Sequence, residues 1–308
     1  MLVTGASSPL AVGVLRRLLS KGDVEIWCGR RRKELPLVDP RLRVIDLDLE
    51  SDLREALSGL AFDLVVHFAG VTHASEEERY WKVNRDATVR LAEAVRENGC
   101  QRFVYISTRC ATRGSGAYGE SKLAAEEELR KLEWKSLLII RPAEVYGDAG
   151  AYGADEADAA RNADAPRNVD APRSSEGIDR MLLTARRWRV VPALFGHSNL
   201  WFAPLHVDDF SRVAAELIQE HSHGVRIETV CGPEDLSALA LAYRIAKRYR
   251  ALPLPLWWPA VSLFLKALTK LRLEIVKPDQ LQRLVGEKTG TAASANKPRE
   301  GFRRFPEN

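Results

Sequence analysis

The chain has 308 residues, of which 45% are hydrophobic and 29% charged, so it can bury the core of one α/β unit with an appended lobe. Its formal net charge of +4 is too small and too dispersed to indicate a nucleic-acid partner. The four cysteines lie far apart without C-x-x-C spacing, which disfavours a zinc site or a disulfide framework and favours a reduced, cytoplasmic location.

The N-terminal residues run directly from Met1 to Thr4 into a glycine turn, so we expect no secretory signal. A first strand of this length is short, and we expect the start of the chain to be trimmed. The most apolar stretch, 251–265, contains three prolines and is shorter than the roughly 20 residues of a spanning helix. We therefore expect no transmembrane span.

The first half of the chain alternates short apolar runs with helical patterns, which predicts an α/β fold with a doubly wound parallel Rossmann sheet. The expected strands are 2–4, 24–27, 43–47, 64–68, 102–106 and 136–140. The expected helices are 12–19, 53–57, 84–97 and 121–131. Sheets of this class bind ligands beyond the carboxyl ends of their strands. We assign residues 1–147 to this domain.

Residues 148–176 lose the pattern and contain a tandem hexad, Asn162–Arg167 followed by Asn168–Arg173. Such a tract buries too little apolar surface to order itself, which predicts a disordered insert, with an active-site lid as the alternative. Residues 177–308 are expected to form a smaller, mostly helical substrate lobe, with helices at 178–187 and 209–220. Part of 200–220 is expected to return to the Rossmann core.

Small residues fill the turn between the first strand and the first helix. Backbone N–H groups of such a turn can approach a pyrophosphate, and the helix dipole favours the negative charge. Of the spacing G-x-x-G-x-x-G only Gly5 remains, with Ser8 and Ala11 in the other places. An ordinary strand-to-helix turn is the alternative. The predicted cofactor contacts here are Gly5, Ser7, Ser8, Pro9 and Leu10.

The second strand ends in Gly29-Arg30-Arg31-Arg32-Lys33, with no carboxylate before Glu34. An acidic residue at this place would bind the ribose hydroxyls of NAD, whereas an arginine can form a bidentate bridge to a 2′-phosphate. We therefore favour NADP over NAD, with Arg30 as its ligand. A solvated basic turn is the alternative.

The segment Tyr118-Gly119-Glu120-Ser121-Lys122 carries the most specific pattern, at the start of a helix after the fifth strand. Residues four apart share one helical face. A lysine ammonium near a phenol stabilises the phenolate, so its pKa moves from about 10 toward neutrality. The pair is therefore the candidate proton-transfer group.

These motifs together resemble the extended short-chain dehydrogenase/reductases, the NAD-dependent epimerase/dehydratase family. The resemblance covers nearly the whole chain apart from the insert and the last residues. Its further motifs are His67-Phe-Ala-Gly70, Asn84-x-x-x-Thr88, Arg141-Pro-Ala-Glu-Val-Tyr-Gly147 and His206-Val-Asp-Asp209.

The resemblance implies a role for each matching residue. Tyr118 would be the general acid/base, and Lys122 its electrostatic helper and a ligand of the nicotinamide ribose. Thr108 would hydrogen-bond the substrate oxygen, although the short spacing to Tyr118 leaves Ser107 and Ser115 open. The remaining implied cofactor contacts are Asp48 or Asp46 with Leu49 at the adenine, Phe68, Ala69 and Gly70 along the cofactor, and Pro142 and Val145 beside the nicotinamide.

Thr72, Arg109 and Glu144 are the predicted substrate contacts, and Glu144 stands where many sugar-nucleotide relatives carry asparagine. Dehydratases that resemble this chain have an acidic pair after the threonine, whereas here Arg109-Cys110 follows. The pattern therefore favours an epimerase or a reductase acting on a hydroxyl or ketone. A nucleotide-sugar is the expected substrate, since the family is rich in them and Arg109, Arg186, Arg187 and Arg189 could meet a diphosphate.

Two other functions stay open at this point. The apolar stretch 252–265 with Trp257 and Trp258, followed by Lys266, Lys270 and Arg272, is compatible with an interfacial helix and a hydroxysteroid-like ketoreductase for an apolar substrate, or with core packing of the lobe. A non-catalytic NADP-sensing or assembly protein would not need the Tyr118/Lys122 pair. His221-Ser-His223 lacks a third ligand, so no metal is expected. We expect a small-molecule substrate and no nucleic acid, and a homodimer is compatible with the sequence.

Overall fold

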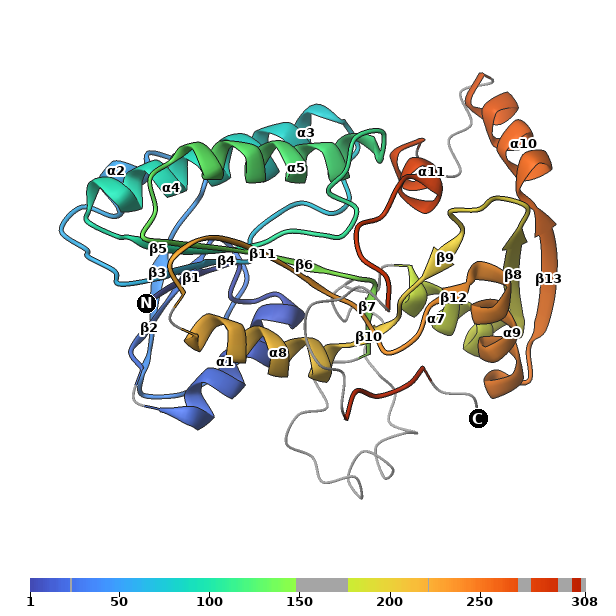
Figure 1. Cartoon of the computed structure of the whole chain (residues 1–308), viewed down its shortest axis with the longest axis horizontal. Coiled ribbons are helices and arrows are strands. Elements are labelled where there is room, and N and C mark those ends of the chain that lie inside the picture. The colour runs from blue at the N-terminus through green and yellow to red at the C-terminus, as the bar shows by residue number, and fades with distance from the viewer. Residues whose placement is uncertain (23, 148–176, 221, 271–277, 293–300, 306–308) are drawn as a thin grey trace.

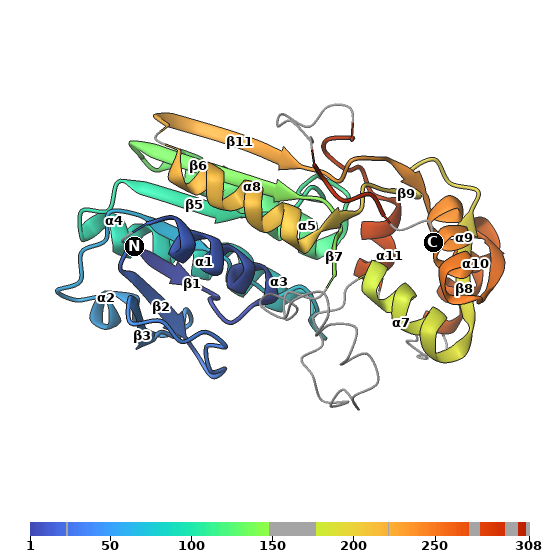
Figure 2. The same cartoon turned by 90° about the horizontal axis from the view of Figure 1, so that it is seen from below.

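A parallel sheet of seven strands forms the larger part of the protein (Figures 1 and 2). The computed structural model describes residues 1–22, 24–147, 177–220, 222–270, 278–292 and 301–305. The sheet consists of β1 (Leu2–Thr4), β2 (Ile26–Arg30), β3 (Leu42–Asp46), β4 (Val65–His67), β5 (Arg102–Ile106), β6 (Ser136–Pro142) and β11 (Gly224–Val230). They pair in the order β11-β6-β5-β4-β1-β2-β3, which confirms the doubly wound prediction. The strand order reverses between β1 and β4, the place where such sheets bind ligands.

Helices cover both faces of this sheet (Figure 1). On one face lie α1 (Pro9–Lys21) and α8 (Val207–Gln219), and on the other lie α2 (Leu53–Ala56), α4 (Ala87–Glu97) and α5 (Gly116–Lys131). Each layer encloses its own apolar cluster, and residues 137–140 of β6 are at most 3% exposed. Burial on both sides explains why β5 and β6 are nearly continuous apolar runs instead of alternating patterns.

Strand β11 and helix α8 bring a late part of the chain back to the sheet. All seven residues of β11 pair with β6, from Gly224 with Ser136 to Val230 with Pro142. This strand was not predicted from the sequence, because Arg226 and Glu228 interrupt its apolar pattern. In the structure these two side chains form an ion pair with each other, and Glu228 is buried.

The helix that precedes β5 is longer than expected. It begins with α3 (Glu78–Tyr80), continues through a π-helical turn, η1 (Trp81–Asp86), and joins α4. Asn84 lies in the π-turn and is fully buried. Since π-turns inside α-helices frequently occur at functional sites, this irregularity points to the ends of β4 and β5.

The smaller lobe combines helices with short strands (Figure 2). It contains α7 (Ile178–Trp188), β8 (Val190–Phe195), β9 (Trp201–Phe202), β12 (Leu236–Ser237), α9 (Ala238–Tyr249), β13 (Leu252–Trp257), α10 (Trp258–Lys270) and α11 (Pro278–Val285). Strands β7 (Val145–Tyr146) and β10 (Leu205–His206) connect it to the sheet. The strand pairs β8–β13 and β9–β12 were not expected from the sequence. Pro253 and Pro255 are tolerated in β13 because it is an edge strand.

The expected insert at 148–176 lies outside the described residues. Within the described ranges, no helix has both the length and the hydropathy needed to cross a membrane.

Helices α1 and α8 cross closely, and this contact holds in place the late segment of α8 and β11 that returns to the sheet. A Cβ atom added at Gly13 would lie 2.2 Å from Ser211 Oγ, so only glycine fits there. We predict that Gly13→Ala lowers the free energy of unfolding by about 1–3 kcal/mol through overpacking. Adding Ser211→Ala should restore part of that loss, which a double-mutant cycle in urea would measure.

Gly22→Ala serves as the matched control, because its added Cβ would meet nothing within 4 Å. Equal stabilities of Gly13→Ala and Gly22→Ala would contradict the close crossing.

Candidate active site

The turn after β1 is pressed against the end of β4. Gly5 has a φ of +67°, and a Cβ added to it would lie 2.5 Å from the backbone nitrogen of Ala69. Ser8 caps α1 by accepting a hydrogen bond from Ala11 N at 3.3 Å. The glycine therefore permits a close approach of two backbones, and the first turn of α1 presents N–H groups that have no partner within the helix.

The turn residues suit a phosphate group at this place. Because Gly5 has no side chain, the backbone of the turn is uncovered there, and the neighbouring Ser7 and Ser8 are small and partly exposed. A capped helix N-terminus favours negative charge. Gly5, Ser7, Ser8, Pro9 and Leu10, the predicted pyrophosphate contacts, lie in this turn and the first turn of α1, where backbone N–H groups are available to an anion.

Arg30 at the end of β2 has two carboxylate partners. Its Nη1 donates to Glu34 at 2.9 Å, and its Nη2 donates to Asp46, its register partner on β3, also at 2.9 Å. Both carboxylates raise the pKa of Arg30 above its ordinary value. Asp48 is exposed and its Oδ1 accepts from Glu50 N at 3.0 Å, while Leu49 is buried. Asp46 therefore pairs with Arg30, whereas Asp48 accepts a backbone hydrogen bond.

The end of β4 is organised by His67 and Asn84. The ring nitrogens of His67 lie 2.6 Å from Thr4 Oγ1 and 2.9 Å from Thr88 Oγ1, and burial lowers the pKa of His67 to about 3. Asn84 accepts from Val71 N at 2.7 Å and donates to Val71 O at 3.0 Å. The neutral histidine joins β1, β4 and α4, and the asparagine fixes the loop after Gly70.

Lys122 lies beneath that loop. Its Nζ donates to Ile106 O at 3.0 Å and lies 4.7 Å from the centre of the Tyr105 ring. A Cβ added at Gly70 would be 3.2 Å from Lys122 Nζ. Lys122 is 4% exposed, and burial lowers its pKa to about 8, with Glu126 opposing part of the shift. The ammonium group of Lys122 is thus held between the carboxyl ends of β4 and β5. Because its pKa is about 8, it can lose its proton near neutral pH.

Helix α5 carries a row of functional side chains at four-residue spacing. Tyr118 is partly exposed, Lys122 is buried, and Glu126 is fully buried. Glu126 accepts hydrogen bonds from Arg141 Nε at 2.8 Å and from Ser107 Oγ. The ion pair fixes α5 against β6, so the face that bears Tyr118 and Lys122 is turned toward the strand ends.

Three hydroxyl groups were candidates for the substrate oxygen, and their surroundings differ. Ser107 Oγ is buried and donates to Glu126, and Ser115 Oγ is fully buried and donates to Cys110 O at 2.7 Å. Thr108 is partly exposed, and its Oγ1 accepts from Cys110 N at 3.2 Å, which leaves its proton to donate. Of the three, Thr108 is the hydroxyl that a substrate can reach.

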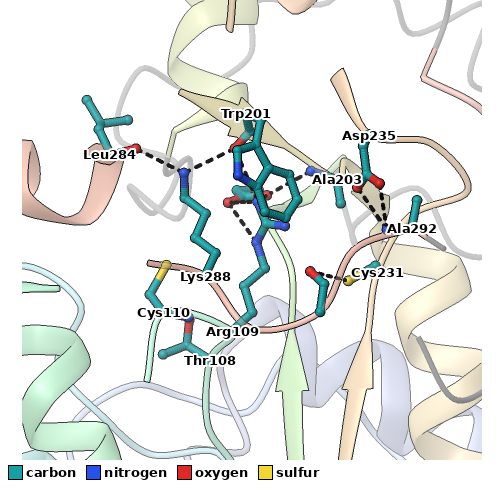
Figure 3. A network of polar contacts seen from close by, with 12 residues as sticks. Thr108, Arg109, Cys110, Trp201, Ala203, Cys231, Asp235, Leu284, Lys288 and Ala292 are labelled. Atoms are coloured by element: carbon teal, nitrogen blue, oxygen red, sulfur yellow. Dashed lines mark hydrogen bonds and ion pairs between the residues drawn. The ribbon is translucent and has the colours of Figure 1, made fainter. Parts of the chain in front are cut away.

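Arg109 is buried and forms an ion pair with the partly exposed Glu144. Figure 3 shows Arg109 beside Trp201 and Lys288. Arg109 Nη2 donates to Glu144 Oε1 at 2.7 Å, and the guanidinium lies 4.3 Å from the centre of the Trp201 ring. Lys288 approaches the same ring and donates to Trp201 O at 3.1 Å. Because Arg109 is 1% exposed, its predicted contact with substrate requires this cluster to open.

The other expected contacts lie around this centre. Pro142 is buried and its carbonyl accepts from Arg109 N at 3.1 Å, while Val145 pairs with Leu205. Phe68 and Ala69 are partly exposed at the end of β4. Arg186, Arg187 and Arg189, which were expected to meet a diphosphate, lie exposed at the end of α7.

Helix α11 contributes site residues that sequence reasoning missed. Arg283 lies 4.0 Å from the centre of the Tyr118 ring and donates to Thr72 O at 2.7 Å and to Tyr80 Oη at 2.9 Å. Asp279, one turn earlier, pairs with Arg283 and accepts from Tyr118 N at 2.9 Å. An Asp and an Arg four residues apart on one helix were the signal available, but nothing local placed them at Tyr118.

Among the residues that the structure describes, no group of three or more His, Cys, Asp or Glu side chains could hold an ion.

A family model and several curated proteins match parts of this chain. The model of the NAD dependent epimerase/dehydratase family matches residues 1–231. A ceramide reductase of Caulobacter vibrioides is 32% identical over 151 residues, which are 47% of this chain and 46% of that protein. UDP-glucose 4-epimerase 3 of Oryza sativa subsp. japonica is 24% identical over 165 residues, 43% of this chain and 44% of that protein. The chain thus spans about half the length of these curated relatives.

Solved structures share the fold over most of the chain. MoeE5, solved with UDP-glucose and NAD, has a TM-score of 0.63 at 21% identity, covering 83% of this chain and 84% of its own. UDP-glucose 4-epimerase of Thermotoga maritima, solved with UDP-glucose, has a TM-score of 0.63 at 18% identity with the same coverage.

Burial of the Lys122 ammonium group makes the free energy of unfolding depend on pH. Below pH 8, Lys122 is protonated in both states, and between pH 8 and 10.5 the folded state loses the proton that the unfolded state keeps. Stability therefore rises with pH in this window. Relative to Lys122→Met, the wild type should gain roughly 3 kcal/mol between pH 7 and 10.5, measured by urea unfolding.

Lys131→Met is the control, since Lys131 is an exposed residue of the same helix that pairs with Glu128. A constant difference between wild type and Lys122→Met across this pH range would contradict the burial of the ammonium.

Proposed function

The chain belongs to the NAD dependent epimerase/dehydratase family, and from that premise we propose that it catalyses epimerisation or reduction at a hydroxyl or ketone of a nucleotide-sugar. The observation that carries this proposal is the position of Tyr118 and Lys122 on one face of α5, at the carboxyl ends of β4 and β5. Tyr118 transfers a proton to or from the substrate oxygen. Lys122 supplies the positive charge beneath it, and Thr108 donates a hydrogen bond to the same oxygen.

Several residues support binding of a nicotinamide dinucleotide. The turn at Gly5 and the N-terminus of α1 would hold the pyrophosphate, and Asp48 with Leu49 would meet the adenine. Phe68, Ala69 and Gly70 would line the cofactor, with Pro142 and Val145 beside the nicotinamide. The bound nicotinamide supplies or accepts the hydride. A retained, tightly bound NAD would favour epimerisation, whereas an exchanging cofactor would favour net reduction.

A phosphate-bearing substrate fits the charge beside Tyr118. Arg283 places a guanidinium against the Tyr118 ring and contacts the carbonyl of Thr72, a predicted substrate contact. Arginine binds phosphate oxygens through bidentate, charge-assisted hydrogen bonds. Arg283 already pairs with Asp279, so we propose that a substrate phosphate competes with this carboxylate for the guanidinium.

A second candidate is reduction of an apolar ketone, such as that of a long-chain lipid. The 32% identity to a ceramide reductase over 47% of the chain favours it. Assays with both substrate classes separate the two, because a lipid ketoreductase would show no turnover with nucleoside diphosphate sugars. The predicted cytoplasmic location and homodimer remain proposals.

The catalytic prediction concerns Tyr118. Tyr118→Phe should reduce kcat by about 10²–10⁴-fold with nucleotide-sugar substrates, since a general acid/base contributes that much, while NAD(P)H binding changes little. Tyr243→Phe, an exposed tyrosine of α9, is the matched control. Unchanged turnover in Tyr118→Phe would exclude Tyr118 as the proton-transfer group, and no binding of a pyridine nucleotide by the wild type would exclude the proposed reaction.

The cofactor prediction concerns Arg30. We propose NADP as the preferred cofactor, because the partners of Arg30 are exposed carboxylates whose surface pairs are weak, and a 2′-phosphate can displace Glu34. Arg30→Ala should raise the KM for NADPH about tenfold and that for NADH little. Arg43→Ala, on the neighbouring strand, is the control, and equal losses for both cofactors would refute the assignment.

A further inference from the structure

The positive charge of the chain is concentrated in the smaller lobe. Segments 180–207 and 236–273 contain no aspartate or glutamate. The arginines and lysines in them are Arg180, Arg186, Arg187, Arg189, Arg244, Lys247, Arg248, Arg250, Lys266, Lys270 and Arg272. The net charge of +4 is therefore the sum of a strongly cationic lobe and an acidic remainder of the chain. Such an asymmetry of charge is typical of proteins that bind an anionic surface.

In the smaller lobe, the sheet formed by β8 and β13 has one buried face and one apolar face that is exposed to solvent. Val191 and Ala193 of β8 are fully buried in the same cluster as residues of α9. Alternate positions point the other way, and in the β8–β13 register Leu252 stands beside Val190 and Leu254 beside Pro192. Leu252 is 64% exposed and Leu254 46% exposed. An all-apolar face of this kind is unusual for a surface that meets only water.

Helix α10 extends the apolar surface at the same end of the protein, away from the Rossmann sheet (Figures 1 and 2). It follows β13 directly, and its Leu263 and Phe264 are 70% and 61% exposed. Trp257, at the junction of β13 and α10, is 56% exposed. Aromatic and leucine side chains of this kind enter the boundary between lipid headgroups and acyl chains.

Cations line the edge where β8 and β13 begin. Arg189 ends α7 and Arg250 ends α9, both in the left-handed conformation and both exposed. Leu252 N donates to Arg189 O at 2.7 Å, which ties the two helix ends together. Arg186 and Arg187 are exposed in the last turn of α7. The exposed leucines are thus bordered by guanidinium groups.

We propose that this distal surface, made of Leu252, Leu254, Leu263 and Phe264 with the bordering arginines, docks the protein onto the surface of an anionic lipid bilayer. The positive border selects acidic headgroups, and the apolar side chains enter the interface. A nucleic acid would match the charge but would leave the leucines without a partner. A second copy of the chain would match the apolar face but would bring like charges together.

The test uses the full chain and vesicles of phosphatidylcholine with 30% phosphatidylglycerol, compared with phosphatidylcholine alone, in a flotation assay. We expect binding to the anionic vesicles at 50 mM NaCl and loss of most of it at 500 mM, because salt screens the attraction. Leu252→Ser/Leu254→Ser and Leu263→Ser/Phe264→Ser should each weaken binding at least tenfold. Arg187→Gln/Arg250→Gln should weaken it about fivefold per removed cation.

Val38→Ser/Val225→Ser is the matched control, since both valines are exposed on the Rossmann domain, and it should bind as the wild type does. Unfolding midpoints of the variants check that each remains folded. The proposal fails if wild type does not float with anionic vesicles, if the serine variants bind equally well, or if sedimentation shows that these substitutions dissociate a dimer instead.

Discussion

The candidate site depends on the enclosure of one ammonium group between a sheet and a helix. Lys122 is buried beneath Gly70, and its nitrogen contacts the carbonyl of Ile106 and the face of the Tyr105 ring. Burying a charge without a carboxylate in direct contact is unfavourable, and the cost appears as the lowered pKa. The surrounding structure must therefore be stable enough to hold it there.

That stability comes from polar contacts that join several elements around the lysine. Glu126 pairs with Arg141 across the α5–β6 interface, Asn84 bridges the loop after β4 to Ser121 of α5, and His67 links β1 to α4. Each of these groups is buried with hydrogen-bond partners, which is the condition under which a buried polar network confers rigidity. The same residues that close the core thus fix the orientation of α5 and of its phenol.

Much of the fold and part of the site followed from local patterns. Helical spacing placed Tyr118 and Lys122 on one face, and the small residues around Gly5 predicted a tight turn, because both features depend on neighbours within a few residues. The pairing of Arg30 with Asp46 was not predictable, since the two residues meet only through the register of β2 with β3. Arg283 lies 165 positions after Tyr118 in the numbering, and no periodicity reports a contact that long-range packing creates. The pairing of Arg109 with Glu144 was missed for the same reason.

The position of α11 has a consequence for the order in which the protein is made. The parallel sheet is complete at Val230, whereas the helix that covers Tyr118 begins only at Pro278. On the ribosome, the N-terminal elements emerge and can fold first. A nascent chain would then have a finished parallel sheet while the Tyr118 ring is still uncovered, and the contacts of α11 with Tyr118 would form last.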